Sequence, residues 1–505
     1  MKAFLMHRDH DFDQQRKLPP NEQALIQDLE LNTLFDAMAL GDKFLLEVIK
    51  KAVLSGLDND LDTIIYRQDV LKDCLKNPSI VRDVYDIAVE SIEREKKVYF
   101  GIFGRHPDTI LHRSIEVLQL FVGTLRKLRD IADAHADKFE SEGFTALFAM
   151  LKKELTDEYF ASVQNHLKEL KFRNGVLISA ELAIGNKGAN YMLRKAPDSS
   201  QSWMQRIFAP KPPVFGFVIA DRDDSGARAL SELREKGINL VANALAQSAD
   251  HILSFFNMLR TELAFYVGCL NLHGQLTQKG EPLSFPLPAA PSERRHSATG
   301  VYDVCLALIL PQRIVGNDLN ADNKELVIIT GANQGGKSTF LRSIGQSQLM
   351  MQCGMFVPAE SYCSNICDGL FTHYKREEDI TMSSGKLDEE LSRMSDIVDN
   401  MTANPMVLFN ESFAATNDRE GSEIARQIIS ALLEERIKVF FVTHLYQFAH
   451  GFYAKKMQST IFLRAERQAD GTRTFRLFEG EPLETSFGED LYRKIFGTDD
   501  EADPA

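Results

Sequence analysis

The sequence predicts a multidomain protein in which a mostly α-helical region precedes an α/β region. Apolar residues recur at three- and four-residue steps over long stretches before residue 282, which is the spacing of amphipathic helices. After residue 300, short apolar runs alternate with helical stretches, which is the pattern of a mostly parallel sheet with helices on its faces. The length of 505 residues is enough for two to four domains.

Residues 1–282 are expected to form a helical core or lever domain. The clearest apolar stripe consists of Ile115, Leu118, Val122, Leu125 and Leu128. A helix places these five side chains on one face, and such stripes are typical of core positions in a helical bundle rather than of a ligand site. A second long helix is predicted from about Ser225 to Cys269.

Two short segments interrupt this helical pattern. Gly175–Leu182 and Val214–Ala220 are rich in β-branched and aromatic residues. We expect them to form a small antiparallel pair near residues 175–220, with an exposed loop between them.

A change of composition marks the end of the helical region. The segment Gly280–Gly300 contains four prolines and many small or polar residues. Proline removes hydrogen-bond donors and small residues loosen the chain, so residues 283–300 are expected to be a linker. The α/β domain then covers residues 301–505, with predicted strands at Leu326–Ile329, Met406–Phe409 and Val439–Val442.

The first of these strands leads into a phosphate-binding motif. Gly331–Ser338 reads GANQGGKS, matches the Walker A pattern, and precedes a predicted helix at Thr339–Gln348. Glycines let several backbone amides converge on phosphate oxygens, and the helix N-terminus adds its positive end. Lys337 supplies a charge at the β and γ phosphates, and Ser338 supplies a hydroxyl ligand to Mg²⁺. The residues expected to bind ATP are Gly331, Gly335, Gly336, Lys337, Ser338 and Thr339.

The other two strands end in polar residues, which a parallel sheet gathers at the same edge. Asn410 and Glu411 follow one strand, and His444 follows the other. Glu411 is the candidate base for the attacking water, and Asn410 is expected to hold Mg²⁺ through a water molecule. His444 is a catalytic candidate that senses the γ-phosphate or holds the water, although a single histidine after a strand is more often structural.

The C-terminal half resembles the MutS family of DNA mismatch-repair ATPases. The similarity covers residues from about Ile314 onward, through IVGNDL, ELVIITGANQGGKSTFLRSIGQSQLM, GMFVPAE, VLFNES, FFVTH and SFGEDL. A weaker similarity lies at Ile65–Val70. The resemblance implies an ABC-like P-loop ATPase that works as a homodimer, with Asn333 also touching the nucleotide. It further implies that the loop of Ser383, Ser384 and Gly385 reaches the partner subunit's nucleotide.

The chain also departs from the family pattern. The Walker B strand normally ends in Asp-Glu, whereas this chain has Asn410 and Glu411. An amide lacks the carboxylate's charge, so slow hydrolysis is expected. The segment Phe413–Thr416 replaces the usual Gly-Arg-Gly-Thr. There is no room before the helical core for the family's mismatch-reading domain, so the polypeptide is not expected to read mismatches by itself.

Composition limits the remaining possibilities. The net charge of −14 gives no support for DNA as a partner, although a local basic patch would suffice. Six scattered cysteines do not form a disulfide framework or a zinc pattern. No apolar stretch is long enough to span a membrane, and the N-terminus lacks a secretory pattern. A cytoplasmic protein without a membrane partner is therefore expected.

Two functional hypotheses follow. The first is an ATP-dependent DNA-binding clamp or lever in DNA repair or recombination, together with a possible repair-protein partner. The alternative is a nucleotide-dependent switch or scaffold that binds a protein partner without DNA, which the net acidity favours.

Overall fold

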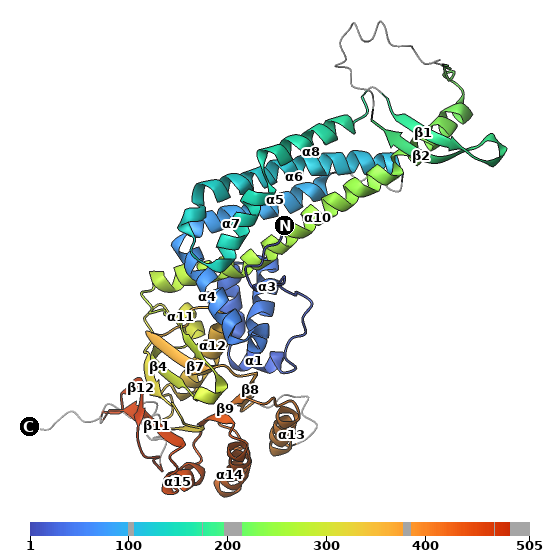
Figure 1. Ribbon diagram of the computed structural model, residues 1–505. Coiled ribbons are helices and arrows are strands. Elements are labelled where there is room, and N and C mark those ends of the chain that lie inside the picture. Colours follow the sequence, from blue (N-terminus) through green and yellow to red (C-terminus); the bar gives the residue numbers. More distant parts are fainter. Residues whose placement is uncertain (99–105, 174, 196–214, 377–384, 469, 485–505) are drawn as a thin grey trace, which may run out of the picture. The chain divides into compact units, whose positions relative to one another are not determined.

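The computed structural model describes the whole chain except residues 99–105, 174, 196–214, 377–384, 469 and 485–505. The chain divides into two compact units, which are described separately (Figure 1). The first unit contains residues 1–3, 82–139 and 145–260. The second contains residues 4–81, 140–144 and 261–505. The second unit therefore combines the N-terminal helices with the α/β region.

The first unit is a bundle of helices with a small β-hairpin. Its elements are most of α5 (Pro78–Lys97), α6 (Pro107–His135), η2 (Ala136–Lys138), most of α7 (Glu142–Glu154), α8 (Asp157–Glu169), β1 (Leu177–Leu182), η3 (Ile184–Asn186), β2 (Gly188–Arg194) and the first part of α10 (Asp224–Gln278). The predicted apolar stripe on α6 is buried along its length, which confirms its core position. Phe121 of this helix packs against Phe256 of α10, with ring centroids 5.5 Å apart.

The expected partner of β1 was wrong. β1 pairs antiparallel with β2, which follows it after a short connection, and not with the segment at residues 214–220. In the described part of that segment, residues 215–220 form no strand, and Phe215 and Val218 are almost fully exposed. A hairpin closes with little loss of chain entropy because its strands are close in sequence, whereas pairing of β1 with residues 215–220 would close a much longer loop.

The second unit is built on a six-stranded sheet in the order β12-β11-β6-β10-β9-β8. The five strands from β11 to β8 run parallel, and β12 pairs antiparallel with β11 at the edge. The strand bounds are β6 (Leu326–Gly331), β8 (Gly369–Tyr374), β9 (Pro405–Asn410), β10 (Lys438–Val442), β11 (Thr460–Arg467) and β12 (Arg473–Glu479). The three predicted strands are therefore present, and they lie side by side in the sheet.

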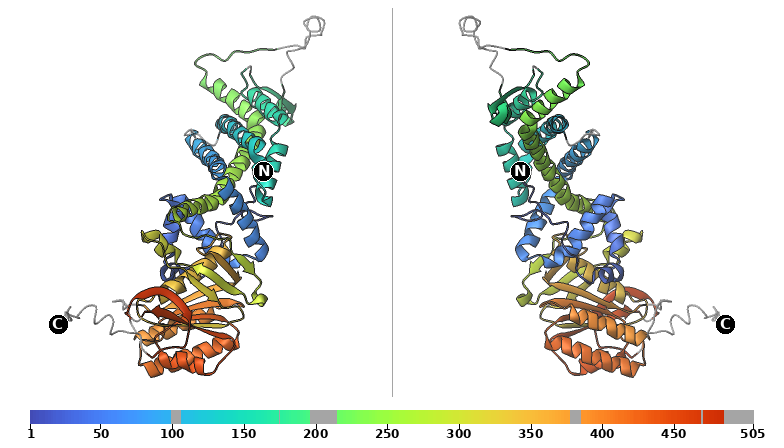
Figure 2. Two further views of the ribbon diagram at one scale, coloured as in Figure 1. Left: turned by 90° about the vertical axis from the view of Figure 1, so that its left-hand side faces the viewer. Right: turned by 90° about the vertical axis from the view of Figure 1, so that its right-hand side faces the viewer.

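Helices cover both faces of this sheet. On one face, α14 (Asp418–Glu434) and α15 (Tyr446–Ala454) form a core with β6, β9 and β10, and α13 (Lys386–Asp399) adds Met394 to it. On the other face lies α12 (Lys337–Gln352), where a Cβ at Gly345 would meet both Leu408 of β9 and Leu29 of the N-terminal region. The side views in Figure 2 show the sheet between these layers. The helix α12 is thus enclosed by the sheet and the N-terminal helices.

The N-terminal helices belong to this unit and are tied to it by buried polar contacts. They are α1 (Glu22–Asp28), α2 (Leu31–Ala39), α3 (Lys43–Leu54), η1 (Ser55–Asp58) and α4 (Leu61–Lys76). The Asn59 side chain donates to the carbonyl of Gln352 at 2.9 Å, and Gln346 donates to the carbonyl of Leu29 at 3.0 Å. Arg67, which lies in the segment Ile65–Val70 of weaker family similarity, is buried and donates to the carbonyl of Met6.

The expected linker at residues 283–300 was wrong for most of its length. The segment contains β3 (Leu287–Ala289), η4 (Pro291–Glu293) and β4 (His296–Val301), which ends one residue beyond it. Both strands join a four-stranded sheet in the order β3-β7-β4-β5, with β5 at Asn317–Asn320 and β7 at Ser361–Asn365. Pro288 is compatible with β3 because β3 is an edge strand, where a missing amide donor costs no ladder bond. The short helix α11 (Val304–Ile309) follows. None of the described helices is both long enough and apolar enough to cross a membrane.

Candidate nucleotide site

The glycine-rich loop has the backbone shape that its sequence predicts. It leaves β6 at Gly331, where φ is 106°, and enters α12 at Gly336, where φ is 87°. A Cβ at Gly331 would lie 2.8 Å from the backbone nitrogen of Ala465, so a side chain is excluded by space as well as by conformation. Because α12 begins at Lys337, the free amides of its first turn face the loop. This arrangement is a ready-made anion site.

Lys337 is buried within the loop. Its amine donates to the carbonyls of Gly331 and Ala332 at 3.0 and 2.9 Å. Burial lowers the pKa of Lys337 to about 8; the nearby charge of Glu411 raises it, and that of Arg473 lowers it further. The lysine is therefore held at the loop in an environment where an added anion would stabilise its charged form.

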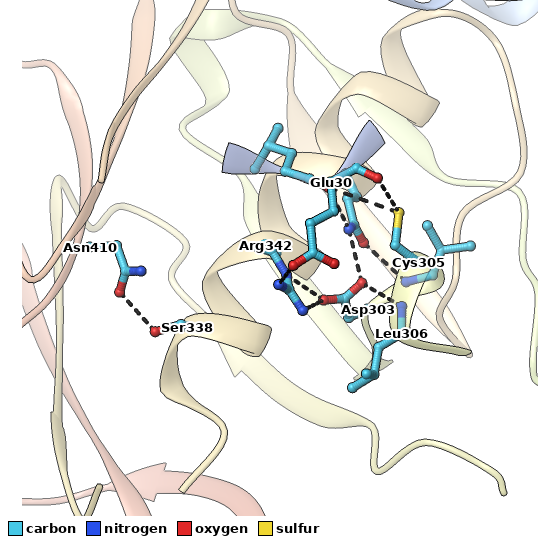
Figure 3. A network of polar contacts seen from close by, with 10 residues as sticks. Glu30, Asp303, Cys305, Leu306, Ser338, Arg342 and Asn410 are labelled. Carbon is cyan, nitrogen blue, oxygen red and sulfur yellow. Dashed lines mark hydrogen bonds and ion pairs between the residues drawn. The ribbon is translucent and has the colours of Figure 1, made fainter. Parts of the chain in front are cut away.

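Two oxygen-bearing side chains meet next to this lysine. The Ser338 hydroxyl donates to Oδ1 of Asn410 at 2.9 Å (Figure 3). Hydroxyl and amide oxygens are suitable ligands for Mg²⁺, which keeps several waters and takes few protein ligands. The described residues contain no cluster of three or more His, Cys, Asp or Glu side chains that could hold a metal on their own. The pair fits a metal that is also bound by substrate phosphates.

Glu411 and His444 form an ion-pair geometry at the same edge of the sheet. Glu411 Oε1 and His444 Nε2 are 2.8 Å apart, and both side chains are about one-third exposed. The hydrogen bond to His444 is the main reason that the pKa of Glu411 is lowered; burial opposes this effect, and Lys337 supports it. Asn410, Glu411 and His444, which were predicted to meet at one edge of the sheet, lie together there in the structure. Their functional roles stay predictions.

A cleft of about 490 Å³ opens beside the loop. Residues 333–340 and Glu411 line one side of it. The rest of the lining includes an apolar wall of Leu306, Leu310, Ile314, Val315 and Phe475, together with the polar residues Asp303, Gln312, Arg313 and Asn317. An apolar wall next to an anion site suits a ligand with a flat ring and a charged tail. Of the residues predicted to bind nucleotide, Asn333, Gly335, Gly336, Lys337, Ser338 and Thr339 line this cleft.

Sequence reasoning missed the contribution of β12 to the cleft. Phe475 lies over Gly336, and Arg473 donates to the carbonyl of Asn333 at 3.1 Å. Neither residue stands near a motif, so only the sheet order brings them to the loop. Ile314 and Val315 carried a signal, since they belong to the IVGNDL segment that resembles the family.

An ionic network fixes the cleft wall to the helix α12 (Figure 3). Arg342 binds the buried Asp303 at 2.7 Å and also forms an ion pair with Glu30. Asp303 in turn accepts hydrogen bonds from the side chain of Gln346 and from the Leu306 amide at the start of α11. The network therefore connects the N-terminal helices, the cleft wall and α12.

The expected trans loop is only partly described. Ser383 and Ser384 lie outside the described residues. Gly385 is exposed and directly precedes α13. Its predicted contact with a partner's nucleotide stays a prediction.

The fold and the cleft define the class: a mixed helical and α/β protein whose parallel sheet carries a glycine-rich loop in front of a helix. Two family models match the chain, the MutS2 N-terminal domain over residues 59–279 and MutS domain V over residues 327–495. The chain belongs to the MutS family.

Relatives support this assignment over about a quarter to a third of the chain. A DNA mismatch repair protein MutS from Clostridium botulinum is 36% identical over 132 residues, which are 26% of this chain and 14% of that protein. The protein of the same name from Syntrophomonas wolfei is 34% identical over 175 residues, 34% of this chain and 20% of its own. A third, from Thermotoga sp., is 37% identical over 134 residues, 26% and 17% of the two chains. The similarity thus spans a fifth or less of each of these relatives.

Proposed function

We propose that the protein is a MutS-like ATPase that binds ATP with Mg²⁺ in the cleft and uses hydrolysis to drive a DNA-binding clamp or lever in repair or recombination. One observation carries the proposal: Lys337, Ser338 and Glu411 line one cleft at the ends of adjacent strands, and Asn410 and His444 contact Ser338 and Glu411 from the same edge of the sheet. Membership in the MutS family supports it.

Binding is assigned to the loop and to the first turn of α12. The loop amides and the Lys337 amine receive the phosphate oxygens, and the apolar wall with Phe475 receives the base. Ser338, and Asn410 through a water molecule, would hold Mg²⁺, which would supply neutralising charge at the phosphates. Asn410 brings no charge of its own, so the metal is expected to be held more weakly than by a carboxylate.

Hydrolysis is assigned to Glu411. The carboxylate accepts a proton from a water molecule whose oxygen attacks the γ-phosphorus, and the bond from that phosphorus to the bridging oxygen breaks. The lowered pKa of Glu411 keeps the carboxylate ionised and ready to accept the proton. His444, at 2.8 Å, orients the carboxylate and can hold the same water.

The test compares the parent with Glu411→Gln and Lys337→Ala. We expect Glu411→Gln to bind ATP and to hydrolyse it at least about 100-fold more slowly, because general-base catalysis contributes about this much. Lys337→Ala should lose ATP binding, while Glu435→Gln, which alters an exposed carboxylate of the same unit, should behave like the parent. Parent-like turnover by Glu411→Gln would refute the assignment of the base.

The second candidate is a nucleotide-dependent switch or scaffold that binds a protein partner without DNA, which the net charge of −14 favours. A mobility-shift titration with duplex, mismatched and branched DNA, with and without ATP, separates the two. Binding that weakens steeply with salt supports the clamp. No binding to any of these DNAs at low salt supports the switch. Sedimentation with and without ATP tests the proposed homodimer.

A further inference from the structure

The backbone that carries Glu411 has an unfavourable conformation. Glu411 has a φ of 54° and Phe413 a φ of 63°, both in the left-handed region that residues other than glycine rarely adopt. Each such residue costs about 1 to 3 kcal/mol unless its surroundings hold it. The direction of the Glu411 side chain therefore depends on what fixes residues 412 and 413.

Two residues from other elements hold this turn. His373 of β8 is fully buried, with Nδ1 2.7 Å from Oγ of Ser412 and Nε2 2.9 Å from the carbonyl oxygen of Glu390. Its ring also stacks on Phe413 at 5.1 Å. Burial raises the pKa of Glu390, and a hydrogen bond from the Phe413 backbone amide to its carboxyl group opposes this rise. Glu390 therefore contacts the turn in two ways: its carbonyl oxygen binds His373, and its carboxyl group binds the Phe413 amide.

The hydrogen-bond pattern assigns the state of the imidazole. A carbonyl oxygen only accepts, so Nε2 carries the proton and donates to Glu390. The Ser412 hydroxyl then has two acceptors, Nδ1 at 2.7 Å and the carbonyl oxygen of His373 at 2.5 Å, and its one proton is shared between them. Burial lowers the pKa of His373 to about 4, so this neutral form is the one present at neutral pH. The ring of His373 therefore connects the Ser412 hydroxyl to the Glu390 carbonyl, and each contact uses one of its two nitrogens.

We propose that His373 is a positioning residue for Glu411: together with Glu390 of α13, it holds the Ser412–Phe413 turn so that the Glu411 carboxylate points at the attacking water. The proposal rests on the function proposed for Glu411. The helix α13 begins at Lys386, one turn before Glu390, so displacement of this helix would reach Glu411 through the same contacts.

The chain offers a matched control pair elsewhere. Ser364 of β7 and His296 of β4 are both fully buried, and Ser364 Oγ lies 3.1 Å from Nδ1 of His296. The pair sits in the four-stranded sheet and lines no part of the nucleotide cleft. Ser364→Ala and His296→Asn thus repeat the chemistry of Ser412→Ala and His373→Asn without the connection to Glu411.

The experiment measures kcat and KM for ATP, ADP affinity by calorimetry, and the thermal midpoint for the parent and for His373→Ala, His373→Asn and Ser412→Ala. We expect His373→Ala to lower kcat by about 10- to 100-fold, because a displacement of about 1 Å can have this effect. ADP affinity should stay within about twofold of the parent, since binding belongs to the loop. His373→Asn, whose Oδ1 can replace Nδ1 as the acceptor from Ser412, should recover part of kcat. The control variants should keep the parent kcat.

Several results would overturn the proposal. In the first, His373→Ala and Ser412→Ala fold and keep the kcat of the parent while Glu411→Gln is inactive. This result refutes the positioning role alone. Another is an equal loss of kcat in the control variants, or a loss of ADP affinity in step with kcat, because a general loss of packing would then be the cause. Parent-like turnover by Glu411→Gln would instead refute the proposed function. If His373→Ala fails to fold, Ser412→Ala, which removes one hydroxyl, decides the outcome.

Discussion

The lowered pKa of Lys337 predicts that ATP binding takes up a proton. With a pKa of about 8, the amine is about nine-tenths protonated near pH 7 and about nine-tenths neutral near pH 9. A triphosphate next to the amine favours its charged form, and we expect the pKa in the complex to return toward about 10. When ATP binds at high pH, the neutral Lys337 amine must therefore take up a proton from the buffer.

The size of the effect follows from linkage between binding and protonation. Between about pH 7 and 9, the neutral fraction reduces the apparent affinity for ATP about tenfold, or about 1.4 kcal/mol. Over the same range, proton uptake rises from about 0.1 to about 0.8 per ATP bound. Affinity is thus lost as the pH rises through the pKa of the free protein.

Titration calorimetry in two buffers of different ionisation enthalpy measures the uptake at each pH. Arg473→Gln is the informative variant, because the charge of Arg473 lowers the pKa of Lys337 and its removal should move the midpoint of uptake to higher pH. The reasoning is refuted if no proton is taken up near pH 9, or if the midpoint stays near the ordinary lysine value.

Three further predictions follow from residues around the cleft. Asn410→Asp should lower the Mg²⁺ concentration for half-maximal ATPase rate at least about tenfold, because a charge near the metal is worth up to about 4 kcal/mol before desolvation; an unchanged Mg²⁺ titration contradicts this. Arg342→Met should cost about 3 kcal/mol of unfolding free energy in urea, since it leaves Asp303 buried and unpaired; a loss below about 1 kcal/mol would exclude that role. Because the pKa of His373 is lower in the folded state, the neutral ring contributes stability that is full above about pH 6.5 and is lost as the pH falls toward about 4. Over this range the unfolding free energy of the parent should fall by up to about 3 kcal/mol more than that of His373→Asn. Equal pH slopes for the two proteins would show that His373 does not titrate in this way.

Much of the sheet and the glycine-rich loop could be predicted because the relevant signals are local. Parallel strands buried on both faces read as apolar runs, and β6, β9 and β10 extend the predicted runs by no more than two residues. The order strand, loop, lysine and helix fixes its own geometry over a few residues. The sequence could therefore place Lys337 and Ser338, and strand direction was enough to bring Glu411 and His444 to the same edge.

What could not be predicted depends on contacts between distant segments. Phe475 and Arg473 reach the loop only because β12 pairs with β11, which itself lies beside β6. His373 contacts Ser412 in the turn after Glu411, and these two residues are 39 positions apart in the sequence. Pro288 suggested a linker because local composition does not reveal that a strand lies at the edge of a sheet. No periodicity or motif records such pairings.

The enclosure of α12 means that the nucleotide-binding part cannot be separated by a single cut. A fragment beginning at residue 301 would keep β9 beneath this helix but would strip Leu29 and Asn59 from its other side. The uncovered apolar surface would favour aggregation. A stable shortened protein would have to keep residues 4–81 and 140–144 together with residues 261–505. The first helices of the chain are therefore part of a fold whose signature motifs lie some 300 residues later.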